Sequence, residues 1–308
     1  MNALDITSIH KSYANHTALN DVSVHMPEGC IFGLLGPNGA GKTSLIRIIN
    51  QITAPDSGEV KFFGERLAPE HVHQIGYLPE ERGLYKKMKI GEQAMYLARL
   101  KGMSKDDARR ELKAWFERFE IGDWWNKKVE ELSKGMAQKV QFISTVLHKP
   151  KLLILDEPFS GFDPINAALI RAEILRLRDE GASIILSTHN MGSVEEICDH
   201  IALINKSRVI LEGSVKEVRK RFDNHEYSIR FSGNLIGFTN ALGANFILID
   251  QKQVEGVHEC TLQLKEGLRL NDLLNAVINQ VDIHEVVPKI PSMNEIFIRA
   301  VQNENAKS

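Results

Sequence analysis

Short uninterrupted hydrophobic runs recur along the first 220 residues, and polar or glycine residues follow each of them. Ile31–Leu35, Leu152–Leu155 and Ser183–Thr188 are runs of this kind. Apolar runs of this length without alternation are typical of strands buried on both faces, as in a parallel sheet. Because functional residues of open α/β sheets gather beyond the carboxyl ends of the strands, the pattern predicts an α/β fold with its site at that edge.

Other segments predict further strands and a block of helices. Strands are expected at Leu4–Ser12, Val22–Met26 and Gly58–Phe63, and a hairpin from Ile201 to Leu211. From about residue 88 to residue 148 the apolar positions return at helical spacing, after a capping box that begins at Ser104. We expect core packing for the three tryptophans, Trp115, Trp124 and Trp125.

The pattern changes after about residue 220. Tyr227, Ile229 and Phe231 alternate as in a half-buried strand, Leu270–Val277 has helical spacing, and Ser292 caps a last helix. We therefore expect two domains, residues 1–220 and a small α+β accessory domain at 221–308, with the helical block at 88–148 inside the first.

A phosphate-binding loop follows the strand Ile31–Leu35. It has the sequence Gly36-Pro37-Asn38-Gly39-Ala40-Gly41-Lys42-Thr43, and helical spacing begins directly after it. Glycines let backbone N–H groups surround phosphates, the lysine reaches the β- and γ-phosphates, and the hydroxyl of Thr43 is suited to Mg²⁺. The loop predicts binding of a nucleoside triphosphate.

Three more segments carry chemistry suited to that ligand. Asp156 and Glu157 end a buried strand, where one carboxylate suits Mg²⁺ and the next suits a base for water. Ser133 and Gly135 begin a helix and predict a second anion site. His189 comes just after the strand Ser183–Thr188.

The order and spacing of these motifs resemble the ATP-binding cassette family, the ABC ATPases, over roughly the first 220 residues. The resemblance implies a P-loop NTPase fold with a β-subdomain and an inserted helical subdomain. It also implies ATP hydrolysis with Mg²⁺. The partners that it implies are a second copy of the chain, or a homologous ATPase subunit, in a head-to-tail dimer around two ATP molecules, and a separate membrane permease that the helical block contacts.

The resemblance implies a role for each motif. Asp156 resembles the Mg²⁺ aspartate, Glu157 the catalytic base and His189 the γ-phosphate switch. Tyr13 resembles the aromatic residue that stacks on adenine, and Asp163 the residue that couples the two sites. Ser133 and Gly135 would bind the ATP held by the partner's loop.

The sequence departs from the family pattern at two places. In the signature, Lys134 replaces a glycine and Met136 replaces a glutamine, although Gly135 is kept. Glu80 stands where the family usually has glutamine, and we expect it to keep an oxygen for Mg²⁺. Glu80 and the following Glu81-Arg82-Gly83-Leu84-Tyr85 resemble sodium-export and drug-export (NatA-like) ATP-binding subunits.

Composition and charge limit the kinds of partner and the cellular locations that the sequence predicts. A formal net charge of −2 and a pI near 6.6 argue against nucleic-acid binding. Cys30, Cys198 and Cys260 form no C-x-x-C pair, so neither a zinc site nor a disulfide framework is expected. No apolar run is long enough to span a membrane. We expect a cytoplasmic chain that lies at the membrane face through its permease partner, with export as the direction implied by the subfamily resemblance.

Two alternatives stay open at this point. ABC ATPases also act in DNA repair, chromosome maintenance and translation, but only 91 residues separate Lys42 from Ser133, which leaves no room for a long coiled coil, and only one cassette is present. A nucleotide-binding module without hydrolysis is the other alternative, and Glu157 argues against it.

Overall fold

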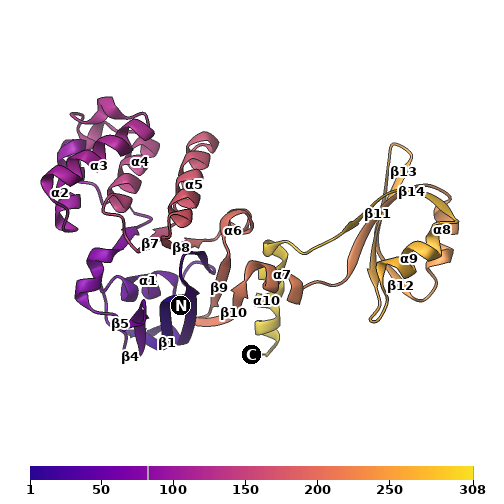
Figure 1. Ribbon diagram of the computed structural model, residues 1–308. Coiled ribbons are helices and arrows are strands. Elements are labelled where there is room, and N and C mark those ends of the chain that lie inside the picture. Colours follow the sequence, from indigo (N-terminus) through magenta and orange to yellow (C-terminus); the bar gives the residue numbers. More distant parts are fainter. Residues whose placement is uncertain (82, 308) are drawn as a thin grey trace. The chain divides into compact units, whose positions relative to one another are not determined.

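The computed structural model of the chain (Figure 1) describes residues 1–81 and 83–307. Arg82, part of the predicted subfamily segment, therefore lies outside the described residues. The chain forms two compact units. The first comprises Met1–Val215 together with Phe297–Ser308, and the second comprises Lys216–Ile296. This division differs from the predicted one at residue 220, because the last segment of the chain belongs with the first unit.

A six-stranded sheet forms the centre of the first unit. Its order is β10-β9-β3-β8-β7-β6, and all neighbours are parallel except β9 and β10, which form the predicted hairpin. The strands are β3 (Ile31–Leu35), β6 (Ile75–Leu78), β7 (Leu152–Asp156), β8 (Ser183–Thr188), β9 (His200–Asn205) and β10 (Arg208–Ser214). Every residue of β3, β7 and β8 is buried, as their continuous apolar runs predict.

A second, antiparallel sheet has the order β2-β1-β4-β5. Its strands are β1 (Asn2–Tyr13), β2 (His16–Pro27), β4 (Ser57–Phe62) and β5 (Glu65–Arg66). Leu4, Ile6 and Val24 of this sheet share one hydrophobic core with Ile46 and Ile49 of the helix that follows the phosphate loop. The antiparallel sheet thus supports the loop from one side.

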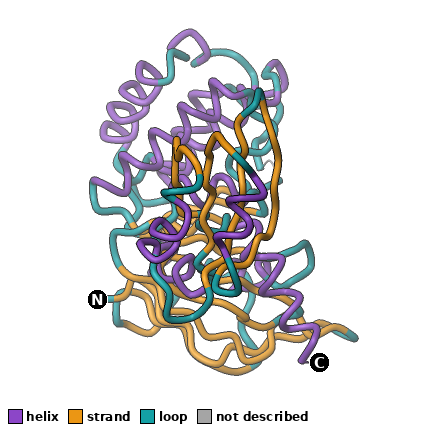
Figure 2. Tube along the Cα trace, turned by 90° about the vertical axis from the view of Figure 1, so that its right-hand side faces the viewer, coloured by secondary structure: helices purple, strands orange, loops and turns teal. Residues whose placement is uncertain are grey.

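Helices complete the first unit. They are α1 (Lys42–Ile49), α2 (Ile90–Leu100), α3 (Lys105–Arg118), α4 (Lys134–Val146), α5 (Pro164–Asp179) and α6 (Met191–Ile197), with 3-10 turns at Pro69–Gln74, Gly122–Trp124 and Val129–Glu131. α2, α3 and α4 form the predicted helical subdomain. In Figure 1 this subdomain and the antiparallel sheet lie at opposite ends of the first unit, with β7 and β8 of the parallel sheet between them. Figure 2 shows helices at one end of the view and strands at the other.

Local sequence explains where these helices begin and what they bury. The Ser104 hydroxyl accepts a hydrogen bond from the Asp107 backbone nitrogen at 3.1 Å, as the capping box predicts. Trp115 is buried in the core of the subdomain. Trp124 and Trp125, in contrast, are only half-buried, because Trp124 ends a short 3-10 turn and Trp125 directly follows it, so neither lies on an inward helix face. The core prediction is therefore right for one tryptophan of the three.

The second unit is an α+β domain built on a four-stranded antiparallel sheet of order β12-β13-β11-β14. Its elements are β11 (Glu226–Gly233), α8 (Leu235–Leu242), β12 (Phe246–Val254), β13 (Val257–Leu264), α9 (Leu270–Val277) and β14 (Val281–Pro288). Its core joins Phe231 of the sheet to Phe238 of α8, whose rings stack at 4.1 Å, and to Leu273 of α9.

Two helices carry the chain across the division. They are α7 (Val215–Arg221) and α10 (Met293–Lys307). Before α10, the Glu295 nitrogen donates to the Ser292 hydroxyl at 3.2 Å and the Ser292 nitrogen donates to the Glu295 carboxylate at 2.8 Å, which completes the predicted capping box. Within the first unit, Lys206 donates to the Asn305 side chain at 2.7 Å.

Candidate functional site

Four strands of the parallel sheet end at one edge, and each delivers a predicted site residue there. The register pairs Leu35 with Thr188 and Asp156 with Ser187, so these strand ends lie side by side. The phosphate loop follows β3, Glu157 follows β7, His189 follows β8 and Glu80 lies two residues beyond β6. The sheet itself brings these groups together, as the sequence predicts.

The phosphate loop requires glycine at two positions for steric reasons. Gly36 has φ +148°, and a Cβ there would lie 2.2 Å from the Ile204 carbonyl oxygen. Gly41 has φ +117°, and a Cβ there would lie 2.4 Å from the Ala18 carbonyl oxygen. Because backbone atoms cannot yield easily, neither position tolerates a side chain. The loop is therefore held between β9 and β2, with Pro37, Asn38 and Gly39 exposed and Ala40 buried.

Lys42 lies inside the loop. Its ammonium donates to the carbonyl oxygens of Gly36 at 2.6 Å and Pro37 at 3.0 Å, and the residue is buried. Burial lowers the pKa of Lys42, whereas the nearby carboxylates Asp156 and Glu157 act in the opposite direction. The lysine is thus held by neutral oxygens beside two anions, a position from which its remaining donor suits a phosphate oxygen.

Asp156 is a buried carboxylate beside other carboxylates. Burial raises its pKa, and the negative charges of Glu80 and Glu157 act in the same direction. Glu80 itself is exposed, and it lines a small cavity together with Asp156 and Glu157. Thr43 is exposed at the start of α1. These oxygens fit Mg²⁺, which proteins commonly bind through one or two carboxylates while substrate phosphates supply further ligands.

Glu157 and His189 are in direct contact. Oε1 of Glu157 accepts from the His189 backbone nitrogen at 2.9 Å and lies 2.6 Å from Nδ1 of the ring. Because a carboxylate only accepts, Nδ1 carries the hydrogen in this contact. The Glu157 backbone adopts φ +48°, which is unusual for a residue with a side chain, and its nitrogen donates to the Ser187 carbonyl at 2.8 Å.

Ser133 and Gly135 lie at the start of α4, as predicted. The Ser133 hydroxyl accepts from the Met136 nitrogen at 3.3 Å and caps the helix. Within residues 1–81 and 83–307, no hydrogen bond connects Ser133 with the phosphate loop of the same chain. Asp163 caps α5 by accepting from the nitrogens of Ile165 and Asn166. Hydrogen bonds lower the pKa of the Asp163 carboxyl, and the one from the Asn166 backbone N–H has the largest effect.

The signature and the loop before α5 contact each other within the chain. Gln138 donates to the Ser160 carbonyl. The Lys134 side chain lies over Gly161, where an added Cβ would be 2.4 Å from its Cε. The aliphatic part of Lys134 thus occupies a place against Gly161, and the substitution of lysine for glycine in the signature has a structural role here.

Tyr13 is separate from the groups described so far. It ends β1, it is 39% exposed, and Lys11 lies 5.4 Å from the centre of its ring. Its partner across the β1–β2 turn is His16, and Ala18, two residues further on, lies against Gly41 of the loop. Stacking of Tyr13 on adenine stays a prediction.

Thr188 was not among the predicted site residues. Its hydroxyl lies 3.1 Å from Oε2 of Glu157, opposite the oxygen that His189 contacts. The one sequence feature that could have indicated Thr188 is its place directly before His189. Serine and threonine are also ordinary residues of a strand, so the strand pattern accounts for Ser187 and Thr188 without a role in the site.

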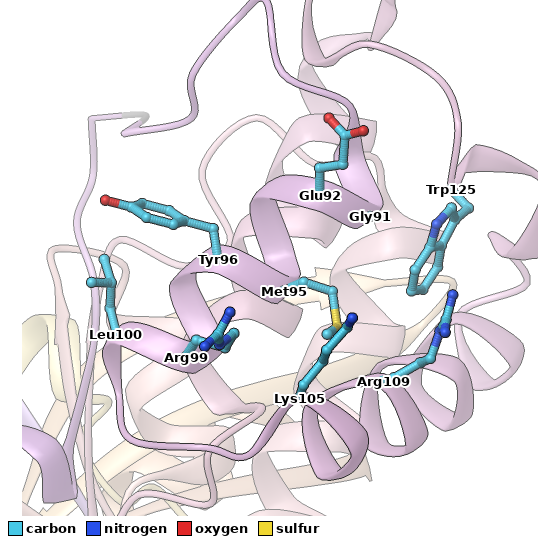
Figure 3. Close-up of a pocket in the computed structure, with 9 residues that line it drawn as sticks. All are labelled: Gly91, Glu92, Met95, Tyr96, Arg99, Leu100, Lys105, Arg109 and Trp125. Carbon is cyan, nitrogen blue, oxygen red and sulfur yellow. The ribbon is translucent and has the colours of Figure 1, made fainter.

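A groove of about 640 Å³ lies in the helical subdomain (Figure 3). Met95, Tyr96 and Leu100 give it an apolar wall on α2, and the Trp125 indole packs directly against Gly91, where an added Cβ would lie 2.5 Å from the ring. Three cations also line the groove: Arg99 from α2, and Lys105 and Arg109 from α3. Across the described part of the chain, none of the three forms an ion pair.

The described residues contain neither a preformed metal centre nor a membrane-spanning helix. No three His, Cys, Asp or Glu side chains in residues 1–81 and 83–307 are grouped as a ready-made metal centre. No helix in the same ranges is both long and apolar enough to cross a membrane.

Known proteins similar to this chain match both parts of it. The family described as "ABC transporter" matches residues 19–160, and the family described as "ATP-binding protein DrrA1-3-like, C-terminal domain" matches residues 213–301. An uncharacterized ABC transporter ATP-binding protein, YhaQ of Bacillus subtilis, is 41% identical over 97% of this chain and 98% of its own length. The chain belongs to the ATP-binding proteins of ABC transporters. It is an ATP-binding, ATP-hydrolysing subunit with a DrrA-like C-terminal domain.

Two further similarities support the family. The bacitracin transport ATP-binding protein BcrA of Enterococcus faecalis is 32% identical over 73% of this chain and 73% of its own length. A solved structure of the ATP-binding subunit of an ABC transporter is 31% identical, with a TM-score of 0.67 over 71% of this chain and 93% of that chain. The predicted P-loop α/β fold is confirmed, and the alternative of DNA repair or translation is not supported.

Proposed function

We propose that this ABC transporter ATP-binding protein powers export through a separate membrane permease, with catalysis at the carboxyl edge of the parallel sheet. The observation that carries the catalytic part is the convergence of Lys42, Asp156 and Glu157, with His189 hydrogen-bonded to Glu157. Export is supported by relatives such as BcrA, which is named for bacitracin transport. The NatA-like subfamily stays a prediction from the sequence Glu80–Tyr85, and the sequence does not name the transported substance.

Glu157 is the base in this proposal. Its carboxylate is close enough to Lys42 to affect the pKa of the lysine, so a phosphate bound by Lys42 would lie near Glu157. A water molecule between them would lose its proton to Glu157 while its oxygen attacks the γ-phosphorus. Mg²⁺, held by Thr43 and Asp156 with Glu80 nearby, would neutralise charge on the phosphates.

A second copy of the chain completes the site. Gly135 lies in the first turn of α4, where an added Cβ would meet the Phe162 ring at an ordinary 3.8 Å. Glycine in a helix costs about 1 kcal/mol relative to alanine, so packing within the chain gives no reason for it. A reason outside the chain is the close approach of a phosphate bound by the partner's loop. Two ATP molecules would then join two subunits head to tail, or this subunit to a homologous one.

The permease docks on the helical subdomain, at the groove of Figure 3. Tyr96 and Leu100 there are 47% and 56% exposed, which is high for large apolar residues on one helix. The cations Arg99, Lys105 and Arg109 favour an amphipathic helix whose apolar face is flanked by carboxylates. Through this partner the chain would lie at the cytoplasmic face of the membrane.

The experiment that tests this proposal uses the chain expressed with its candidate permease. The pair is purified in detergent through a tag on the permease, and ATPase activity of the complex is measured. Reversal of charge in the groove, Arg99→Glu with Arg109→Glu, should reduce recovery of the ATPase by about tenfold or more. The exposed Lys220→Glu serves as the matched control. Equal recovery of the groove variant and the control would contradict docking at this surface.

A further inference from the structure

Thr188 joins the end of β8 to the carboxylate after β7. The residue is 1% exposed, and its hydroxyl oxygen lies 3.1 Å from Oε2 of Glu157 and 3.1 Å from the backbone nitrogen of Asn190. The register places Thr188 opposite Leu35, the last residue of β3 before the phosphate loop. Thr188 therefore ends the strand that lies between β3, which leads into the phosphate loop, and β7, which leads into the proposed base.

The direction of both hydrogen bonds follows from chemistry. The Asn190 N–H can only donate, so the Thr188 oxygen accepts there. The Glu157 carboxylate can only accept, so the single hydroxyl hydrogen of Thr188 points to Oε2. The threonine hydroxyl is thus oriented by the backbone on one side and fixes the carboxylate on the other.

The two side chains that hold Glu157 differ in their freedom to move. The His189 side chain is 71% exposed, so its ring can turn toward a phosphate without disturbing the core. Thr188 is buried in a strand that pairs with neighbours on both sides, β3 and β7. When the ring of His189 turns away, the Thr188 hydroxyl and the His189 backbone N–H remain as the contacts that orient Glu157.

The contacts also distinguish the two carboxylate oxygens. Among the residues that the structure describes, Oε1 accepts twice, from the nitrogen and the ring of His189, whereas Oε2 accepts once, from Thr188. Since each carboxylate oxygen has about two acceptor sites, Oε2 keeps a free site while His189 is in place. The hydroxyl of Thr188 determines where that site points.

We propose that Thr188 is a positioning residue for hydrolysis, which holds Glu157 so that Oε2 receives the proton of the attacking water. In that step the water oxygen forms a bond to the γ-phosphorus, the bond from this phosphorus to the bridging oxygen breaks, and the proton passes to Oε2. The products are ADP and inorganic phosphate. The inference rests on the proposed role of Glu157 as the base.

The test compares Thr188→Val, which keeps the shape and loses the hydroxyl, with Thr188→Ser, which keeps the hydroxyl. ATP turnover is measured on the full chain. The valine variant should have a kcat about tenfold lower with KM for ATP within about twofold, because one hydrogen bond to a charged group is lost. The serine variant should stay within about twofold of the wild type. Should the valine variant be insoluble, Thr188→Ala takes its place.

A double-variant cycle separates positioning from a structural role. In a Glu157→Gln background, single-turnover hydrolysis should fall no further when Thr188→Val is added, because the group that Thr188 orients is already disabled. An equal tenfold loss in both backgrounds, or a serine variant as slow as the valine variant, would overturn the inference. A full rate in Glu157→Gln alone would instead end the proposed role of Glu157.

Discussion

Nδ1 of His189 lies 2.6 Å from Oε1 of Glu157, and the backbone nitrogen of the same histidine lies 2.9 Å from the same oxygen. The ring and the backbone of one residue therefore hold one oxygen of the proposed base. In the imidazolium form both ring nitrogens donate, so Nε2 of the exposed ring can then bind a phosphate oxygen while Nδ1 stays on Glu157. One histidine can thus connect the base with the bond that is broken.

The Glu157→Gln variant tests the base directly. Glutamine keeps the shape but accepts protons poorly, so turnover should fall by about 10²-fold or more while ATP affinity changes little. The variant should accumulate as an ATP-bound dimer, which size-exclusion chromatography with MgATP detects. Hydrolysis at the wild-type rate would contradict the role of Glu157 as the base.

Gly135→Ala separates stability from catalysis at the signature. The space around Gly135 admits a methyl group, and alanine favours a helix by about 1 kcal/mol, so the free energy of unfolding should rise slightly. ATP turnover should fall strongly, because the methyl group would meet the partner's phosphate. Thermal unfolding and an ATPase assay measure the two effects. The matched control is Gly161→Ala, which should not stabilise the chain, because the φ of +78° at Gly161 is strained for any residue with a side chain.

Cross-linking tests the head-to-tail arrangement. One chain carries Ser133→Cys and another carries Asn38→Cys, both in the Glu157→Gln background that keeps ATP bound. All three natural cysteines are buried, which limits background reaction. We expect cross-links between the two chains only with MgATP. A third chain that carries both cysteines is the control. Cross-links that form within this chain but not between the two single-cysteine chains would refute the arrangement.

Glu80→Gln tests the metal prediction. If the Glu80 carboxylate takes part in binding Mg²⁺, its loss should raise the Mg²⁺ concentration needed for half-maximal turnover by about three- to tenfold, with ATP binding kept. We also expect weaker coupling to the permease. The measurement is ATPase activity across a Mg²⁺ titration. An unchanged Mg²⁺ requirement would favour a contact of Glu80 with the permease instead.

The lowered pKa of His148 predicts that the folded chain loses stability in mild acid. Burial is the main cause that lowers its pKa to about 4, and the charge of Lys101 adds to it. The unfolded chain takes up this proton near pH 6.5. The contribution of neutral His148 to the free energy of unfolding is therefore complete above that pH and is lost as pH falls toward 4. It amounts to at most about 3 kcal/mol. Urea unfolding between pH 7 and pH 4 measures it, and His148→Leu should flatten the curve whereas His16→Gln should not.

The parallel sheet and its site were predictable because they depend on local patterns. Buried strands give continuous apolar runs, and parallel pairing then brings their carboxyl ends to one edge whatever the order of the strands. Lys42, Asp156 and His189 could therefore be placed at that edge from short motifs. Trp125 could not, because its exposure depends on a 3-10 turn that packs it against Gly91, a tertiary contact with no periodic signal.

Thr188 and the end of the chain show a second limit. The side chain of Thr188 is indistinguishable by pattern from any strand residue, and only the φ of +48° at Glu157 brings that carboxylate back toward it. The last segment has the pattern of a helix after an accessory domain, but its place in the first unit depends on contacts such as that of Lys206 with Asn305.

Removal of the second unit tests its independence from nucleotide binding. None of the predicted site residues lies between Lys216 and Ile296, so a chain in which residues 223–291 are replaced by a short Gly-Ser linker should bind MgATP normally. A chain that ends at Phe222 should also bind it, but with a lower unfolding temperature, because it lacks the buried Ala300 and the contact of Asn305. Altered dimerisation of the linker variant would indicate that the second unit has a regulatory role. Aggregation of this variant would indicate that the second unit has a structural role.

The return of the chain to its first unit also affects how the protein is made. Segments from Phe297 onward leave the ribosome only after the whole antiparallel domain, so the ATPase unit cannot acquire its last helix during most of synthesis. Domains generally fold as they emerge, the N-terminal one first. Here the first unit can be finished only after the second has been synthesised, and a ribosome that stalls within β11–β14 leaves an ATPase without its final part.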